Sequence, residues 1–138
     1  MAHSTITKGR HSELLAQTAL LANGYSVAEP IAPEPFDLLA RAPGTMEWLR
    51  IQIKSARARD DRNGEVVAYA RKNNGKPYDK EDCDLFIAVL DGEVYMFENR
   101  ELSEYWCPAH ALSEKWTKLS TGIETLAGVN QMNEAEAV

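Results

Sequence analysis

The chain has 138 residues, of which 44% are hydrophobic and 26% are charged, and its formal net charge is −6. This length and composition are typical of a single globular domain, and no apolar run approaches the roughly 18 residues that a membrane-spanning helix needs. The N-terminal residues lack the apolar stretch of a signal peptide, so we expect a cytoplasmic protein without a membrane segment, whose two cysteines stay reduced. We expect one domain over residues 1–128 and a disordered acidic tail over 129–138.

The charges are unevenly distributed along the chain. Residues 1–80 carry twelve basic and nine acidic side chains, whereas residues 81–138 carry three basic and twelve acidic ones. The basic residues concentrate between Arg50 and Lys80, and such a local cluster is what contact with phosphates requires. Each of them could equally be a solvated surface charge.

The first half of the chain predicts one helix and then three strands. Apolar residues at helical spacing and a terminal Asn-Gly pair predict a helix over about 8–23. A short strand over 25–28 and a proline-containing loop follow. Strand-like runs over 36–42 and 47–56, joined by the turn Pro43-Gly44-Thr45, predict a β-hairpin.

The second half predicts a buried central strand. Residues 57–64 read as a polar loop, and 65–71 are ambiguous between strand and helix. The most apolar run, 84–90, predicts a buried strand that an Asp-Gly turn connects to a strand over 93–97. Two short C-terminal helices are expected over 100–106 and 110–120. This order of elements predicts an α/β fold with a mixed sheet.

Candidate metal ligands lie on three of these elements. Successive side chains of a strand point to opposite faces, so Gln52 and Lys54 share one face of the predicted strand. Mg²⁺ takes hard oxygen ligands, and these could come from Asp37, the Gln52 side chain, the Ile53 backbone carbonyl and Glu13, directly or through water. Lys54 could orient the attacking water and balance the charge of a phosphate.

Each of these residues also has an ordinary structural explanation. Glu13 could be an exposed helix residue, and Asp37 could cap a turn. Gln52 and Lys54 could form the solvent face of a hairpin.

The same residues resemble the motif of the PD-(D/E)xK nuclease superfamily. Pro35-Phe36-Asp37 matches the P-D element with one residue inserted, Gln52-Ile53-Lys54 stands where (D/E)-x-K would be, and Glu13 matches the acid of the first helix. The stretch from Gly9 to Glu13 resembles the start of Holliday junction resolvase-like members. Gln in the (D/E) position is similar to the group I intron homing endonuclease branch. The resemblance covers about residues 8–98.

The resemblance implies a restriction-endonuclease-like αβββαβ core with a mixed central sheet, and the C-terminal helices would be additions to it. In that topology the first helix flanks the face that carries Gln52 and Lys54. The implied activity is Mg²⁺-dependent cleavage of DNA, with Mn²⁺ as a substitute ion. The homo-oligomer would be a dimer on branched junctions or a tetramer on a long duplex site.

Residues that could contact DNA are basic, polar or aromatic and lie near the predicted site. They are Arg10, Gln17, Ser55, Arg57, Arg59, Arg71, Lys72, Lys76 and Tyr78. Tyr78 could equally be packed in the core. Since an amide at position 52 brings no negative charge, a catalytically degenerate binding module on the same fold stays an alternative. A further alternative is an unrelated α/β interaction protein.

Overall fold

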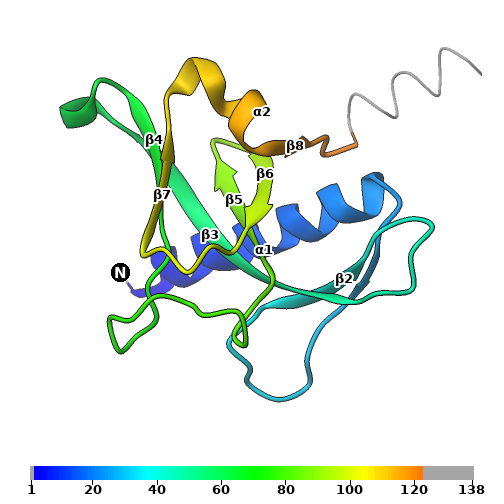
Figure 1. Cartoon of the computed structure of the whole chain (residues 1–138). Helices are drawn as coiled ribbons and strands as arrows, with labels where there is room; N and C mark the ends of the chain where they lie inside the picture. Colours follow the sequence, from blue (N-terminus) through cyan, green and yellow to red (C-terminus); the bar gives the residue numbers. More distant parts are fainter. Residues whose placement is uncertain (1, 123–138) are drawn as a thin grey trace, which may run out of the picture.

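The computed structural model describes residues 2–122, with side chains from residue 5 onward. In this range one long helix lies against a curled, mixed sheet of eight strands (Figure 1). The tail predicted over residues 129–138 lies outside the described residues. Within residues 2–122, no helix has both the length and the apolar content that crossing a membrane requires.

The helices and strands follow the chain in a simple order. They are α1 (Ala2–Ala22), β1 (Ser26–Ala28), β2 (Leu38–Arg41), β3 (Leu49–Arg59), β4 (Glu65–Tyr69), β5 (Leu85–Leu90), β6 (Glu93–Glu98), β7 (Glu104–Cys107), α2 (Leu112–Lys115) and β8 (Thr117–Leu119). Short 3-10 turns at Asp60–Arg62 and Ala109–Ala111 complete the list.

Strand β3 organises the sheet because it pairs with three other strands. Its first half pairs antiparallel with β2 and parallel with β5, with Ile53 opposite Ile87. Its second half pairs antiparallel with β4, with Ala56 opposite Ala68, and β4 in turn pairs with β7. The sheet therefore bends along β3, so that β4 and β7 cover one face of the strands β3, β5 and β6.

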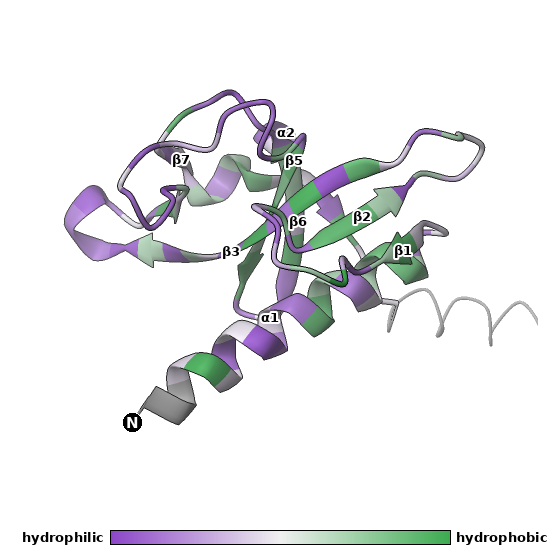
Figure 2. Ribbon diagram, turned by 90° about the horizontal axis from the view of Figure 1, so that it is seen from below, coloured by the Kyte–Doolittle hydropathy of each residue, from purple (hydrophilic) through white to green (hydrophobic). Residues whose placement is uncertain are grey.

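The two faces of β3 belong to two different cores. Ile51 and Ile53 are buried with Ala16 and Leu20 of α1, so the helix covers this apolar face. Figure 2 shows α1 running along the sheet, with its N-terminal turns extending beyond it. Gln52 pairs with Phe86 of β5, and Phe86 belongs to the second core, on the opposite face. The expectation that the first helix flanks the face of Gln52 and Lys54 is therefore wrong, because the apolar alternate residues of β3 recruit the helix instead.

Several predicted elements are confirmed with small shifts in their ends. The hairpin of the second and third strands is β2 and β3, and the buried central strand is β5, whose residues Phe86–Val89 are all buried. The turn at Asp91-Gly92 joins β5 to β6, and both of its residues have positive φ, 48° and 82°. The ambiguous segment 65–71 is mostly strand, as β4. Helix α1 begins at Ala2 rather than near residue 8.

The prediction of two C-terminal helices is largely wrong. The first segment contains β7 instead, in which Tyr105 and Cys107 are buried and Trp106 between them is exposed. This two-residue alternation favours the strand that pairs with β4. The second segment contains only the four-residue α2 and then β8, which pairs with β6.

The connection between β3 and β5 also departs from expectation. The expected αβββαβ order places a helix there, and residues 57–64 were expected to form a loop. Instead β3 continues to Arg59 and β4 begins at Glu65, so the ladder extends through Arg57 and Arg59 and the turn is confined to 60–64. Among the described residues, the only helical turn between β3 and β5 is the 3-10 turn at Asp60–Arg62, directly after β3.

Candidate functional site

Asp37 immediately precedes β2 and is fixed to β3 through both its backbone and its side chain. Its backbone N donates to the Ile51 carbonyl oxygen at 2.8 Å, and the Ile53 backbone N donates to its carboxylate Oδ2, also at 2.8 Å. The carboxylate thus serves as the next acceptor of the β2–β3 ladder beyond the N-terminal end of β2. Because the N–H and C=O of one strand residue point to the same side, the Ile53 carbonyl also points toward the side of Asp37, where β2 no longer pairs with β3.

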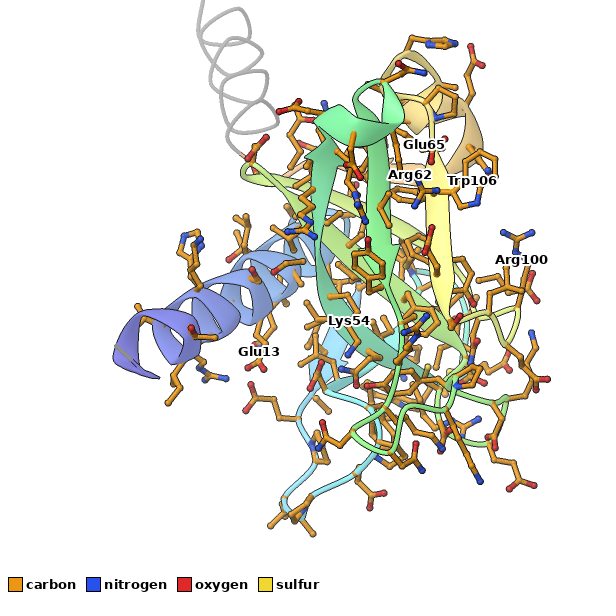
Figure 3. The ribbon with its side chains drawn as sticks, turned by 90° about the vertical axis from the view of Figure 1, so that its left-hand side faces the viewer. Glu13, Lys54, Arg62, Glu65, Arg100 and Trp106 are labelled. Atoms are coloured by element: carbon orange, nitrogen blue, oxygen red, sulfur yellow. The ribbon has the colours of Figure 1, made fainter. Side chains whose placement is uncertain are left out.

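The charge of Asp37 interacts with those of Glu13 and Lys54. Burial raises the pKa of Asp37 above its ordinary value of 3.8, the hydrogen bond from Ile53 lowers it, the nearby Glu13 charge raises it and the Lys54 charge lowers it. Glu13 comes from α1 and Lys54 from β3 (Figure 3). The structure therefore brings Glu13, Asp37 and Lys54 into one electrostatic neighbourhood.

Asp37 also lies where two surface clefts meet. The larger cleft, of about 450 Å³, is lined by Glu34, Pro35, Asp37, Gln52, Lys72, Asn73, Asn74 and Tyr78. The second, of about 330 Å³, contains Arg10, Glu13 and Glu29 and shares Glu34 and Asp37 with the first. Asp37 thus lines both clefts, while its backbone N is hydrogen-bonded to β3.

Gln52 is half-buried, and its side chain lines the larger cleft. Its Nε2 donates to the Ile53 carbonyl oxygen over a long 3.4 Å, and its Oε1 accepts no hydrogen bond from the described residues. The amide oxygen is therefore available beside Asp37.

Lys54 is half-buried and forms a cation–π contact rather than an ion pair among the described residues. Its Nζ lies 4.9 Å from the centroid of the Tyr78 ring. Tyr78 is only 7% exposed and meets Phe86 edge to face at 5.5 Å. A ring packed in this way has little surface for stacking on a base, so the structure supports the packing alternative for Tyr78 over the stacking one.

The candidates on α1 form a small polar network near the second cleft. Arg10 pairs with Glu13 at 3.1 Å and with Glu29 at 3.5 Å, and Gln17 donates to Glu29 at 2.6 Å. Ser55 projects on the helix side of β3, where its hydroxyl lies 3.4 Å from that of Ser12. Arg10, Gln17 and Ser55 are therefore engaged within the protein, and part of the Glu13 charge is compensated by Arg10.

The basic candidates from Arg57 onward divide into those that form ion pairs within the described residues and those that do not. Arg59 binds Asp61 and the Tyr69 hydroxyl, and Lys72 pairs with Asp82 at 2.9 Å while lining the larger cleft. Three exposed basic side chains form no ion pair with any described residue. They are Arg57, which lies 5.9 Å from the Tyr69 ring centroid, Arg71 and Lys76.

Sequence reasoning missed four polar residues that line these clefts. They are Glu29, Glu34, Asn73 and Asn74. Glu34 lies three residues before Asp37 in the proline-containing loop, and the asparagines lie in a predicted turn beside Lys72. Their positions in loops that flank motif residues were the available signal, since functional side chains are often carried by loops on a rigid scaffold.

The oxygen donors around Asp37 are suited to binding a hard cation, although few of them are charged. Within residues 2–122, no three His, Cys, Asp or Glu side chains gather in a group that could hold a metal ion. The oxygen donors predicted for the Asp37 neighbourhood are its own carboxylate, the Gln52 amide, the Ile53 carbonyl and Glu13. Mg²⁺ accepts such mixed oxygen ligands and usually keeps several waters, so the chemistry of this set fits, with less negative charge than an all-carboxylate site.

Comparisons with known proteins identify the family and the fold of the chain. A family model described as PD-(D/E)XK endonuclease matches residues 3–135. Among solved structures, that of a bacterial homing endonuclease, I-Ssp6803I, is similar with a TM-score of 0.63 and 21% sequence identity, over 98% of this chain and 99% of that chain. At this identity the similarity shows a shared fold. A comparison with curated protein sequences finds no match.

Proposed function

The chain belongs to the PD-(D/E)XK endonuclease family, and from this membership we propose that it is a metal-dependent endonuclease that hydrolyses phosphodiester bonds in DNA. The observation that carries the proposal is the Asp37 carboxylate. It is fixed by the Ile53 N–H at the end of β2, lines both clefts and interacts with the charges of Glu13 and Lys54.

The proposed roles follow from the chemistry of each side chain. Asp37, the Gln52 amide oxygen and the Ile53 carbonyl would hold the metal ion, with Glu13 bound directly or through water. A bound Mg²⁺, or Mn²⁺ in its place, would polarise the phosphate and lower the pKa of a water ligand. Lys54 would orient the attacking water and offset the charge that develops on the phosphate.

We propose that DNA approaches the larger cleft from the side of the exposed basic residues. Lys72 lines this cleft, and the exposed Arg57, Arg71 and Lys76, which form no ion pair within the described part of the chain, supply positive charge. Arg10, Gln17, Ser55 and Arg59 would contribute only if DNA displaced their present partners. A domain of this size gains contact area by self-association, as a dimer on branched junctions or a tetramer on a long duplex site. A solution mass equal to one chain at micromolar concentration, measured by light scattering, would contradict an oligomer.

Cleavage assays test the proposal directly. Labelled four-way junction, branched, single-stranded and linear duplex DNA would be incubated with Mg²⁺, Mn²⁺ or EDTA. We expect cleavage by the wild type with either ion, none with EDTA, and none by Lys54→Ala. Lys118→Ala is the matched control, because Lys118 is a basic residue of β8 that pairs with Glu93 away from both clefts, and it should leave cleavage intact. The preferred DNA would separate junction resolution from site-specific cleavage.

Gln52 supports a second candidate function, a non-catalytic binding module on the nuclease fold. An amide in the (D/E) position and the lack of a three-residue metal-binding group within residues 2–122 both weaken a metal site. The module predicts DNA binding without cleavage in the wild type, and a gain of metal affinity and cleavage in Gln52→Glu. Wild-type cleavage that Asp37→Ala abolishes would exclude it.

A further inference from the structure

The Lys54 ammonium needs something to hold it in place. A lysine side chain has several rotatable bonds, so a strand backbone alone does not position its end. Lys54 forms no ion pair with any described residue, and its Nζ instead lies over the face of the Tyr78 ring, 4.9 Å from the ring centroid. Cations are attracted to aromatic faces at such distances by the ring quadrupole.

Tyr78 is well suited to hold another group because its own position is fixed. The ring is 7% exposed and packs its edge against Phe86. Before it, Pro77 forms a β-bridge with Arg71. After it, the buried Asn99 donates to the Asp79 carbonyl oxygen at 2.9 Å. The ring is therefore held from the core and from both directions along the chain.

Tyr78 is also the residue that connects Lys54 to the larger cleft. It lines this cleft together with Asp37 and Gln52, whereas Lys54 is not one of the lining residues. The Tyr78 hydroxyl forms no hydrogen bond with any described residue and is not one of the fully buried polar atoms, so part of its surface is in contact with solvent. Its ring and its hydroxyl therefore have different surroundings and can be tested separately.

We infer that Tyr78 is a positioning residue for Lys54, whose ammonium it holds through the ring face at the border of the cleft that Asp37 and Gln52 line. The inference rests on the proposed function for its catalytic purpose, but the contact itself does not. Without the ring, Lys54 would spread over several rotamers, and the fraction of molecules with a correctly placed ammonium would fall. Binding of DNA through other residues would be little affected.

The contact can be measured without metal or DNA. In protein labelled with ¹³C-lysine, the ε-methylene protons of Lys54 should be shifted upfield by the Tyr78 ring current, and the signal is assigned by its loss in Lys54→Arg. The upfield shift should persist in Tyr78→Phe and disappear in Tyr78→Leu. Its absence from the wild-type spectrum would overturn the inference even if Tyr78→Leu failed to fold.

The catalytic purpose is tested by kinetics on the best cleaved DNA. Tyr78→Leu should lower kcat about 3- to 30-fold, the range expected from losing one cation–π contact, with KM within about twofold. Tyr78→Phe should retain kcat within about twofold. If Tyr78→Phe loses as much as Tyr78→Leu, the hydroxyl matters and the ring does not, which overturns the inference.

A second cation–π pair provides the control. The Lys115 Nζ lies 4.3 Å from the Trp106 ring centroid, on α2 and β7, and Figure 3 shows Trp106 well away from Lys54. Trp106→Leu removes this pair and should change neither the Lys54 signal nor kcat. A wild type that cleaves no DNA would refute the proposed function and the catalytic purpose of Tyr78 together, while the NMR signal would still decide whether Tyr78 holds Lys54.

Discussion

Replacing Asp37 with Asn or with Ala should separate the stability of the protein from its activity. Asn has the same shape as Asp, and its oxygen can still accept the hydrogen bond that the Ile53 N–H donates at 2.8 Å. Ala leaves this N–H without its acceptor, which costs about 1–3 kcal/mol for a buried amide. Asn also removes a carboxylate whose pKa is raised by burial and, to a smaller extent, by the Glu13 charge. We therefore expect Asp37→Asn to be at least as stable as the wild type at pH 7, and Asp37→Ala to be less stable.

The stability difference between Asp37→Asn and the wild type should depend on pH. The pKa of Asp37 is higher in the folded chain than its ordinary value of 3.8, so between these two values the folded state binds more protons than the unfolded state. Asp37 therefore contributes its full stabilisation to the wild type below the ordinary pKa. Part of this contribution is lost as the pH rises through the pKa of the folded state. Asp37→Asn has no such loss, so its advantage should grow from acidic to neutral pH.

Thermal unfolding at several pH values and a cleavage assay together test this reasoning. For a chain of this size, 1 kcal/mol corresponds to a change in Tm of about 3–5 °C, so Asp37→Ala should unfold roughly 3–15 °C below Asp37→Asn. Both variants should lose metal-dependent cleavage, because neither has a carboxylate at position 37. Equal Tm values for the two variants, or cleavage by Asp37→Asn, would refute the role assigned to this carboxylate.

Three further predictions concern residues in the interior of the protein. Burial raises the pKa of Cys83 to about 12 and also raises that of Cys107, so a thiol reagent at pH 8 should react slowly with the native protein and rapidly with two thiols after unfolding in urea. Asn99→Leu should destabilise the chain by about 2–4 kcal/mol in urea titrations, because Asn99 is fully buried and its hydrogen-bond partners would be left unsatisfied. Trp116→Ala should cost about 3–5 kcal/mol in the same titration because Trp116 is 3% exposed, whereas Trp106→Ala, at a 45% exposed site, should cost less than about 1 kcal/mol.

The motif strands could be predicted because their pattern is local. The alternation from Leu49 to Lys54 is sufficient to define a strand and its two faces, and the Pro-Gly turn before it defines a hairpin. The neighbourhood of Glu13, Asp37 and Lys54 was predicted from the family resemblance, and the charge interactions at Asp37 agree with it.

The arrangement of the faces could not be predicted from the same pattern. Alternation shows that Ile51 and Gln52 point in opposite directions but does not show which face receives α1. That choice depends on long-range pairing with β5 and on β4 and β7 covering the other face. The cation–π contact of Tyr78 with Lys54 has the same origin, since the two residues are 24 positions apart and meet only in the folded chain.

Strand β7 shows a different limit of prediction from the sequence. The segment before β7 contains Glu101, which has a positive φ of 61°, and β7 itself is only four residues long. Short strands have weak local signals, and the pairing of β7 with β4 is what stabilises it. A helix was therefore predicted for residues that tertiary contacts hold as a strand.

The three-fold pairing of β3 determines how the candidate site can open. Gln52 and Lys54 lie in the part of β3 that pairs with the buried central strand β5, and the amides of such core strands exchange with solvent only in large openings of the domain, so these two should be among the slowest to exchange. The Ile53 amide is an exception, because its acceptor is a carboxylate at the end of the short strand β2, next to the edge of the sheet. Its exchange rate should therefore report local opening at Asp37, and it gives a single-residue probe of whether a metal ion or DNA closes that end of the sheet.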